Sequence, residues 1–285
     1  MQPLIDADIF LYEVGSVGQY VDETTGDIVY RDFEWVAELL HSKVDEICKS
    51  VGATSEPRLF LTGNEKYWGD KYVPNFRESI AVSKKYKGTR RQDKPFHYYN
   101  LYHYIISSFD TVVSNGCEAD DLIGIEQFSR RNDGETIICT RDKDIRMVPG
   151  AHYGWECGKQ AEFGPHYYTD EGEIELVRKY DRHGKCTSSK IVGGGKAFFF
   201  AQLLTGDVVD NIGGLVRTGP IKAYDLLSEC RTEDDYLSVV KQSYRTQVGE
   251  EGWLEALKEQ ADLLWISRER NEDGSLVGYE GFSSV

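Results

Sequence analysis

TVVSNGCEADDLIG, residues 111–124, joins a short apolar run to a turn, three carboxylates within four positions, and a second apolar run. An apolar run bounded by turn residues is typical of a buried strand. The acidic residues suit a helix start, because the helix dipole is positive there. A strand followed directly by a helix predicts an α/β unit. No Lys or Arg stands beside Glu118, Asp120 and Asp121 to neutralise them, so the crowding of charge needs a further explanation.

The same pattern recurs along the chain. Apolar runs predict buried strands, and apolar residues at helical spacing predict helices. Strands alternating with helices predict an α/β fold with a mostly parallel sheet, helices on both faces, and a site at the carboxyl edge of the strands. We expect the aromatic residues of 96–109 to belong to the core, and 271–285 to be a weakly structured tail. The expected strands are 3–11, 58–62, 111–115 and 135–140; the expected helices are 34–52, 96–109 and 119–131; 150–196 should form hairpins and loops, and helices should follow from residue 197.

Composition excludes several classes of protein. The six cysteines are scattered without a CxxC pair, so neither a zinc site nor a disulfide framework is expected. No apolar run is long enough to cross a bilayer, and the N-terminus lacks the basic leader of a signal peptide. The net charge of −15 argues against a nucleic-acid partner. However, residues 84–94 (KKYKGTRRQDK) contain six Lys or Arg and one Asp, a basic segment in an acidic chain.

Acidic pairs stand where strands are expected to end. Residues two apart in a strand, or three apart in a helix, share a face, so each pair can direct its carboxylates to one place. Carboxylates crowded in a cleft are stabilised by divalent cations, and oxygen-only ligands suit Mg²⁺ or Mn²⁺. Two such ions can hydrolyse a phosphodiester. The alternative is that the pairs are separate helix caps and turn residues. The pairs are Asp6 and Asp8, Glu118 with Asp120 and Asp121, Asp142 and Asp144, and Asp207 and Asp210.

Five motifs in one order resemble the 5′ nuclease superfamily, which comprises flap endonucleases and 5′→3′ exonucleases, and especially its bacteriophage members. The motifs are LIDADIF (residues 4–10), YKGTR (86–90), EADD (118–121), TRDKD (140–144) and GDVVDNIGG (206–214). The resemblance spans about residues 3–227. It implies a PIN-like fold with a helical arch at about 66–97 and a C-terminal helical region containing a helix–three-turn–helix. It divides the chain into a nuclease domain, 1–196, and a duplex-binding region, 197–285.

The resemblance also implies roles for individual residues. Lys87 and Arg90 would be catalytic residues of the arch, and Lys84, Lys85, Tyr86 and Arg91 would contact DNA. Arg217 and Lys222 would contact duplex phosphates. The implied cofactors are two or more Mg²⁺ or Mn²⁺ ions, with a monovalent cation as a candidate at the helix–three-turn–helix. The implied metal ligands are Asp6, Glu118, Asp120, Asp121, Asp142, Asp144, Asp207 and Asp210.

The implied activity is a metal-dependent 5′→3′ exonuclease or flap endonuclease in DNA replication, recombination or RNA primer removal. Its substrates would be DNA with 5′ ends, flaps or nicks, with RNA/DNA hybrids and replication proteins as further candidate partners. We expect a monomer without membrane contact, in the cytoplasm of a phage-infected bacterial host.

Two positions depart from the family pattern. Where the family carries a further metal-binding Asp after its second strand, this chain has Gly63 and Asn64, so a ligand is lost unless Asp8 or Asn64 substitutes. In the helix–three-turn–helix, a glycine of the family is replaced by Arg217, and the lysine shifts to Lys222. The phosphate-binding backbone is therefore less certain than the metal ligands.

Two other functions compete with this one. In a phosphatase of the haloacid dehalogenase type, Asp6 would be the nucleophile and Asp8 the acid/base, but EADD, TRDKD and YKGTR would be unexplained. A structure-specific DNA-binding protein with a decayed nuclease site is the second alternative, and Gly63 and Asn64 favour it.

Overall fold

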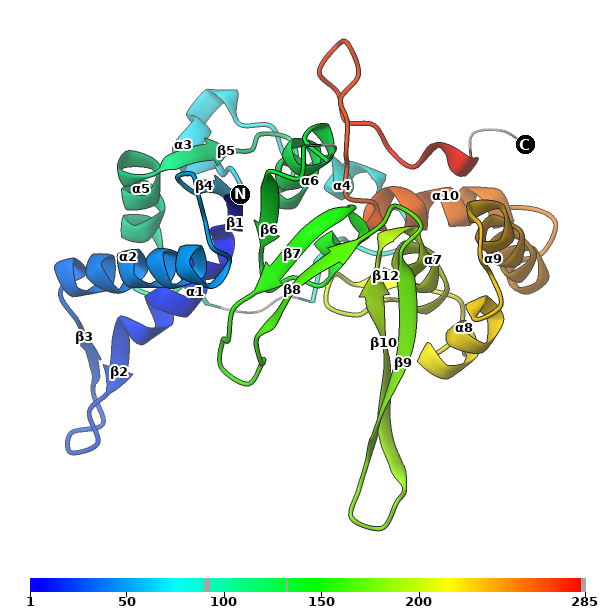
Figure 1. Ribbon diagram of the computed structural model, residues 1–285, viewed down its shortest axis with the longest axis horizontal. Coiled ribbons are helices and arrows are strands. Elements are labelled where there is room, and N and C mark those ends of the chain that lie inside the picture. Colours follow the sequence, from blue (N-terminus) through cyan, green and yellow to red (C-terminus); the bar gives the residue numbers. More distant parts are fainter. Residues whose placement is uncertain (90–92, 132, 283–285) are drawn as a thin grey trace. The chain divides into compact units, whose positions relative to one another are not determined.

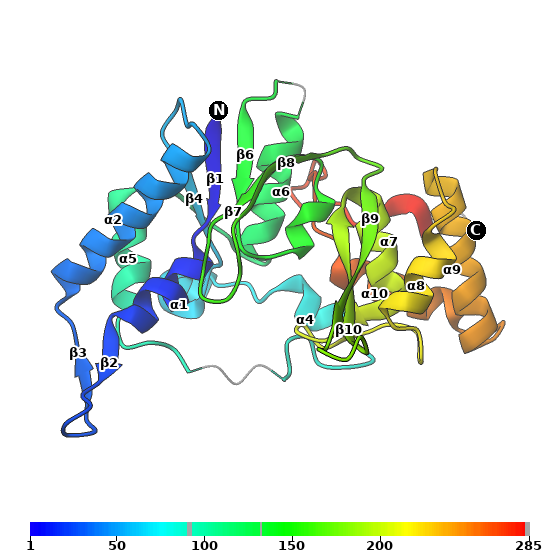
Figure 2. The same ribbon diagram turned by 60° about the horizontal axis from the view of Figure 1, so that its bottom comes forward.

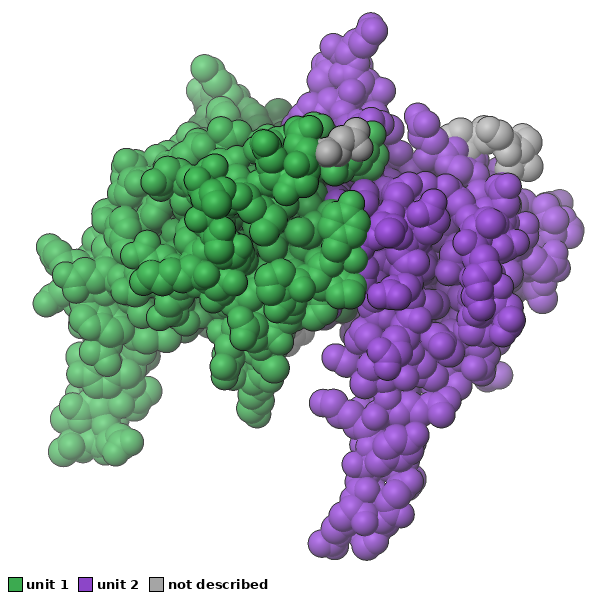
Figure 3. Space-filling model, viewed as in Figure 1, with its two compact units in different colours: residues 1–74, 91–143, 150–167 green, residues 75–90, 144–149, 168–285 purple. Residues whose placement is uncertain are grey.

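The computed structural model describes residues 1–89, 93–131 and 133–282, and the chain forms two compact units (Figure 3). Unit 1 comprises residues 1–74, 91–143 and 150–167. Unit 2 comprises 75–90, 144–149 and 168–285. These limits differ from the division at residue 196 that the sequence suggested, and the separate roles of two domains stay a prediction. Among the helices described, none is both long and apolar enough to span a membrane.

Unit 1 is built on a six-stranded sheet with the strand order β5-β4-β1-β6-β7-β8. The five strands from β5 to β7 run parallel, with β1 at the centre between β4 and β6. This confirms the mostly parallel sheet that the apolar runs predicted. The strands are β1 (Gln2–Asp6), β4 (Arg58–Leu61), β5 (Asp110–Val113), β6 (Thr136–Cys139), β7 (Gly150–Gly154) and β8 (Phe163–Tyr168).

Helices cover both faces of the sheet (Figures 1 and 2). On one face α1 (Asp8–Val17), α2 (Phe33–Ser50) and α5 (Tyr98–Ser108) enclose a core that includes Ile5, Leu59 and Ile137. Alternation along the strands turns Leu4 and Asp6 to the opposite face, where α6 (Ala119–Ser129) packs against β1, β4 and β6. Of the aromatic residues of 96–109 that were predicted to belong to the core, Tyr102 is buried and Tyr98 packs against the core, whereas Phe96 is exposed.

One expectation for unit 1 was wrong. The apolar run 3–11 is not one strand, because the chain turns at Ala7 and α1 begins at Asp8. In the segment expected to form a helical arch, 66–97, the described residues contain short helical segments, and the arch stays a prediction; residues 90–92 lie outside the described part. The short helical segments are α3 (Glu65–Trp68), η1 (Gly69–Lys71) and, in unit 2, α4 (Phe76–Ile80). Elsewhere in unit 1, between α1 and α2, the chain forms a small hairpin of β2 (Gln19–Val21) and β3 (Ile28–Tyr30).

Unit 2 is mainly helical from residue 195 onward, as the sequence predicted. Its central helix α7 is buried along its length, because its Ala, Phe and Leu side chains face neighbours on all sides. A two-residue pairing of β11 (Gly206–Asp207) with β12 (Ile212–Gly213) follows it. The helices are α7 (Gly195–Thr205), α8 (Pro220–Leu227), α9 (Glu233–Val248), α10 (Trp253–Leu264), η2 (Asp144–Met147) and η3 (Glu280–Phe282).

Within the expected tail, residues 279–282 pack against unit 2. Tyr279 and Phe282 are buried, and the Tyr279 ring lies 4.9 Å from that of Phe199 on α7. The Tyr279 hydroxyl donates a hydrogen bond to Glu233 at the start of α9. The aromatic residues of the tail therefore complete the core of unit 2.

A buried arginine fastens α4 to α10. The Arg77 side chain is 1% exposed, and its guanidinium donates to the carbonyl oxygens of Leu263 and Trp265 at the end of α10. These carbonyls lack partners inside the helix. A second anchor follows, because Glu259 accepts hydrogen bonds from the backbone of Val82 and Ser83. Residues 76–83 are thus held by α10.

Candidate functional site

Threonine 140 joins two of the acidic motifs at the carboxyl edge of the unit 1 sheet. Its hydroxyl donates to Asp6 Oδ2 over 2.8 Å and accepts from the backbone N–H of Asp142 over 3.0 Å. Asp6 ends β1 and Asp142 follows β6, and these strands are neighbours. Thr140 thus connects the LIDADIF and TRDKD motifs.

Thr62 makes a similar connection on the other side of β1. Its N–H donates to Asp8 Oδ1 over 3.0 Å, and its hydroxyl accepts from the N–H of Ala119 over 3.0 Å. Thr62 directly follows β4, and Ala119 begins α6. The start of α6 is thereby placed at the same sheet edge as Asp6 and Asp8.

Part of the EADD motif has a structural role. Glu118 and Asp121 form a capping box at the start of α6, in which Asp121 Oδ2 accepts from the Glu118 N–H over 3.2 Å. Asp121 is fully buried, whereas Glu118 and Asp120 are half-buried. The helix-start interpretation thus holds for Glu118 and Asp121, and the capping box does not involve Asp120.

Asp6 has an unfavourable environment for a charge. Its side chain is buried, and burial together with the nearby Asp8 and Asp142 raises its pKa from 3.8 to about 8. The hydrogen bond from Thr140 offsets only part of this effect. At neutral pH the ionised form of Asp6 thus requires a compensating positive charge.

This environment predicts that the metal-free protein loses stability as the pH rises. The pKa of Asp6 is higher in the folded chain than in the unfolded one, so the neutral carboxyl stabilises the fold fully below about pH 4. That contribution is lost as the pH rises through about 8. Urea midpoints measured in EDTA should fall across this range, and Asp6→Asn should flatten the decline. An identical decline in both proteins would contradict the assignment.

The donor set suits a hard divalent cation. Asp6, Asp8 and Asp142 offer only carboxylate oxygens, the ligands that Mg²⁺ and Mn²⁺ prefer. In the described residues, no group of three or more His, Cys, Asp or Glu side chains is already arranged as a metal site. The residue types therefore fit the ions, although the side chains do not form a finished coordination shell.

The other three predicted ligands, Asp144, Asp207 and Asp210, lie in unit 2. Asp207 is buried, and its Oδ1 accepts from the N–H groups of Val209 and Asp210. Asp144 begins η2 and accepts from Gln202 of α7. The boundary between the units passes between residues 143 and 144, so the TRDKD motif contributes one carboxylate to each unit.

Asp210 connects the last acidic motif to the basic segment. Its Oδ2 accepts from the Tyr86 hydroxyl over 3.1 Å and lies 3.9 Å from Lys87 Nζ. Its carbonyl oxygen accepts from the Lys87 N–H, and Asn211 Nδ2 donates to the carbonyl of Lys85. The YKGTR and GDVVDNIGG motifs, more than a hundred residues apart, thus meet within unit 2.

The remaining residues of the basic segment differ in position. Lys84 and Lys85 are exposed. The Tyr86 ring is buried, 7% exposed, so its role in stacking on a base stays a prediction. Arg90 and Arg91 lie outside the described residues.

Arg217 and Lys222 are both exposed and flank the start of α8. Arg217 has a φ of +57°, a conformation that L-residues other than Asn, Asp and Gly seldom adopt. The chain therefore retains at Arg217 the backbone conformation that glycine adopts most readily.

Searches against known proteins identify the fold. No protein-family model and no curated protein matches the sequence. The 5′-exonuclease of bacteriophage T5 with bound zinc aligns with 93% of this chain and 99% of its own, at a TM-score of 0.51 and 13% identity. The T5 flap endonuclease, in a pseudo-enzyme-product complex with DNA and metal ions, aligns with 92% and 94%, at a TM-score of 0.51 and 13% identity. The T5 protein co-crystallised with metal ions aligns with 90% and 87%, at a TM-score of 0.50 and 15% identity.

The chain has the 5′-nuclease fold. Within this fold, Gly63 cannot be replaced by a metal-binding Asp without rearrangement. A Cβ atom at Gly63 would lie 2.0 Å from the carbonyl oxygen of Ser114 and 2.6 Å from Trp68 Nε1. Asn64 caps α3, with its side chain accepting from the Tyr67 N–H. Asp8 is therefore the better placed of the two candidate substitutes, because it lies beside Asp6.

Two threonines of this chain were not singled out from the sequence. Thr62 and Thr140 each directly follow a strand, and each connects a carboxylate to a neighbouring motif. Their position was visible in LFLT and IICT, where a hydroxyl ends an apolar run. That pattern is common at strand ends, so it does not by itself indicate a function.

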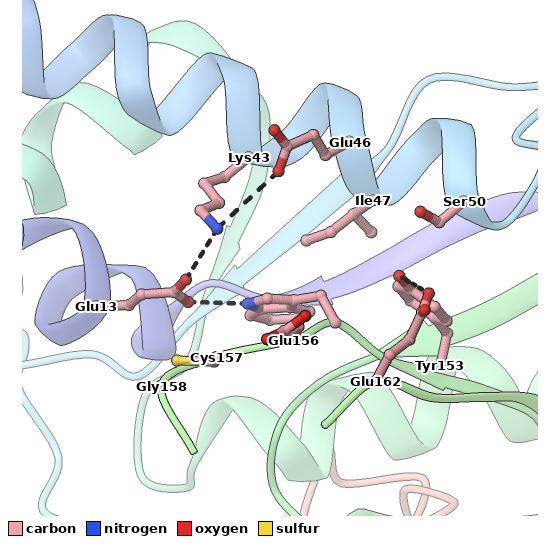
Figure 4. A pocket seen from close by; sticks show the side chains of 11 residues that line it. Glu13, Lys43, Glu46, Ile47, Ser50, Tyr153, Glu156, Cys157, Gly158 and Glu162 are labelled. Atoms are coloured by element: carbon pink, nitrogen blue, oxygen red, sulfur yellow. Dashed lines mark hydrogen bonds and ion pairs between the residues drawn. The ribbon is translucent and has the colours of Figure 1, made fainter. Parts of the chain in front are cut away.

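A separate cavity of about 550 Å³ in unit 1 lies between α1, α2 and the segment after β7 (Figure 4). Its polar groups are already paired. Glu13 accepts from Trp155 Nε1 and lies 3.4 Å from Lys43, and Tyr153 donates to Glu162. Burial and the nearby Glu13 raise the pKa of the Cys157 thiol, which makes it a poor nucleophile. We assign no ligand to this cavity.

Proposed function

We propose that this chain is a divalent-metal-dependent 5′ nuclease that hydrolyses DNA phosphodiesters near 5′ ends, flaps or nicks. The observation that supports this most strongly is the connection of Asp6 to Asp142 through Thr140, with Asp8 nearby, at the carboxyl edge of the parallel sheet. It occurs in a chain with the 5′-nuclease fold. DNA replication, recombination and RNA primer removal are the processes that need such an activity.

The carboxylates of unit 1 would hold the cations. Asp6, Asp8, Asp120 and Asp142 are the proposed ligands there, with Glu118 and Asp121 also fixing the start of α6. Mg²⁺ or Mn²⁺ bound by such carboxylates supplies an activated water and stabilises the leaving oxygen. Thr62 and Thr140 would orient the carboxylates through the hydrogen bonds described above.

The residues of unit 2 would act on the phosphate and on the duplex. Lys87 carries a positive charge that can offset the charge that develops on the scissile phosphate. Asp210 and Tyr86 hold Lys87 in place in the structure without DNA. Asp144, Asp207 and Asp210 are the proposed ligands from this unit, and Arg217 and Lys222 are the proposed duplex contacts.

The phosphatase alternative fits the structure less well. It needs an acidic residue at the end of a strand of the main sheet, whereas Asp207 follows the buried helix α7. The other alternative, a structure-specific DNA-binding protein with a decayed nuclease site, differs from the nuclease only in that it does not cleave DNA.

One experiment separates the three functions. End-labelled flapped, nicked and blunt duplexes are incubated with Mg²⁺, Mn²⁺ or EDTA, alongside a small phosphomonoester. The proposed nuclease should release short products from the 5′ end only when a divalent ion is present. Cleavage of the phosphomonoester alone would favour the phosphatase, and binding without cleavage under all conditions would favour the decayed protein.

The duplex contact can be tested separately with Arg217→Gly/Lys222→Ala. Glycine suits the positive φ at residue 217, so a lost interaction there reflects the missing charge and not a damaged backbone. The affinity for duplex DNA should fall. The slope of log affinity against log salt concentration should become flatter by about 0.9 for each lost phosphate contact, for up to two contacts, while the affinity for single strands changes less. An unchanged salt slope on duplex would place the contact elsewhere in the chain.

A further inference from the structure

The hairpin of β9 (Glu173–Tyr180) and β10 (Cys186–Gly194) projects from the rest of unit 2 (Figures 1 and 3). The two strands pair only with each other, in antiparallel register. With eight and nine residues they extend about 26–30 Å, at about 3.3 Å per residue. The two strands pack against α7 and α8. In the distal part of the hairpin, residues 178–188 are all exposed.

The distal part is strongly basic. Residues 176–190 contain five Lys or Arg and a single Asp, in a chain of net charge −15. The five cations, all exposed, are Arg178, Lys179, Arg182, Lys185 and Lys190.

These cations are not used to stabilise the unit. Within the part of unit 2 that the structure describes, no carboxylate lies within ion-pair distance of any of them. The single Asp of the stretch, Asp181, serves the turn, because its Oδ1 accepts from the backbone N–H groups of His183 and Lys185. The positive charge of the hairpin is thus directed to solvent.

The register places cations on both faces of the ribbon. Arg178 pairs with Ser189 and shares its face with the exposed Tyr180. Lys179 pairs with Ser188, and Lys190 pairs with Val177. Because Val177 and Lys179 are two residues apart in β9, both lysines lie on the face opposite to Arg178. Arg182 and Lys185 occupy the turn. A ligand that engaged one flat side of the ribbon would leave the cation or cations of the opposite face unused.

We propose that the β9–β10 hairpin is a duplex-DNA-binding arm that contacts backbone phosphates without reading sequence. A two-stranded ribbon fits the major groove of B-DNA, where phosphates flank it on both sides. This arrangement complements cations on both faces, whereas an acidic protein surface would engage one face. A single strand is bound mainly by several stacked aromatic rings, and this part of the hairpin offers one exposed ring, Tyr180. The inference rests on the proposed function, because it assumes that DNA is the substrate.

A different explanation is that lysines protect the exposed strand edges from pairing with other chains. Charge reversal separates the two roles, because a glutamate also protects an edge but repels phosphate. The test pair is therefore Lys179→Glu/Lys190→Glu. The matched control is Lys241→Glu/Lys258→Glu, which makes the same change in net charge on α9 and α10 of the same unit.

Affinity for a long blunt duplex is measured by fluorescence anisotropy in EDTA, so that no cleavage occurs, over a range of salt concentrations. The variant Lys179→Glu/Lys190→Glu should bind the duplex on the order of tenfold more weakly than the parent. Its slope of log affinity against log salt concentration should be flatter by up to about 1.8. The control pair should stay within about twofold of the parent. Lys179→Arg/Lys190→Arg keeps both charges and should retain the parent's slope.

Several results would overturn the inference. One is that the hairpin variant and the control variant lose the same duplex affinity. Another is that the hairpin variant loses as much affinity for single strands as for duplexes. A third is that the hairpin variant loses binding to polyglutamate and keeps its duplex affinity. The last result would indicate an acidic protein partner. Failure of the proposed function looks different, because the parent itself would then neither bind nor cleave DNA. A parent that cleaves flaps while the hairpin pair retains full duplex affinity would refute only the hairpin's role.

Discussion

Asp142→Ala is expected to abolish cleavage of a 5′-flapped duplex, by about 10³-fold or more, while DNA binding remains or improves. Asp142 follows β6, and its N–H is held by the threonine that also contacts Asp6. Loss of a carboxylate that holds a catalytic ion removes several kcal/mol of transition-state stabilisation. Loss of a negative charge near phosphate also relieves repulsion. Single-turnover cleavage in Mg²⁺ and binding in EDTA measure the two effects separately.

Asp133→Ala is the matched control for this experiment. Asp133 lies in the turn before β6, is exposed, and is the same type of residue only nine positions away. Its replacement should leave cleavage within about twofold of the parent, as for most surface substitutions. Full activity in Asp142→Ala would remove this carboxylate from the proposed ligand set.

Lys87→Ala should slow cleavage by about 10²–10³-fold and weaken duplex binding far less. The proposed role of Lys87 is to offset charge at the scissile phosphate, and losing one such group costs about this much in rate. Lys85→Ala removes the same charge from an exposed neighbour and should act mainly on affinity. Comparison of kcat with KM for the two variants measures the difference.

Equal losses of rate and affinity in Lys87→Ala would show that the basic segment is an electrostatic patch. The structure also connects this prediction to Asp210, which is 3.9 Å from the Lys87 ammonium group. If Lys87 acts on the substrate, it must exchange Asp210 for phosphate when DNA binds. We therefore expect Asp210→Asn to reduce cleavage even when the metal concentration is raised.

The sheet and its acidic edge could be predicted because each depends on local pattern. Short apolar runs bounded by turn residues located β4, β5 and β6 within one or two residues. The carboxylates that follow strands then had to meet, since neighbouring parallel strands end at one edge. The pairing of Asp6 with Asp142 follows from this argument.

Other features depend on packing that the sequence pattern does not record. The strand at residues 2–6 ends within LIDADIFLY because the chain turns at Ala7, yet the residues remain apolar on both sides of the turn. Tyr279 and Phe282 looked like part of a tail, because Phe199, the partner of Tyr279, is eighty residues away in the chain. No sequence pattern indicates that Arg77 is buried, because the carbonyls that hold it come from the end of a distant helix.

The attachment of Arg77 has a consequence for how the protein is made. Its partners, Leu263 and Trp265, are 186 and 188 residues further along the chain. At a synthesis rate of about 5–20 residues per second, a ribosome needs roughly 10–40 s to reach them after Arg77 has been added. During that time the β1–β6 part of the sheet can already form, since its strands come from the first half of the chain. Residues 76–83 therefore gain their support on α10 only after α10 has been synthesised.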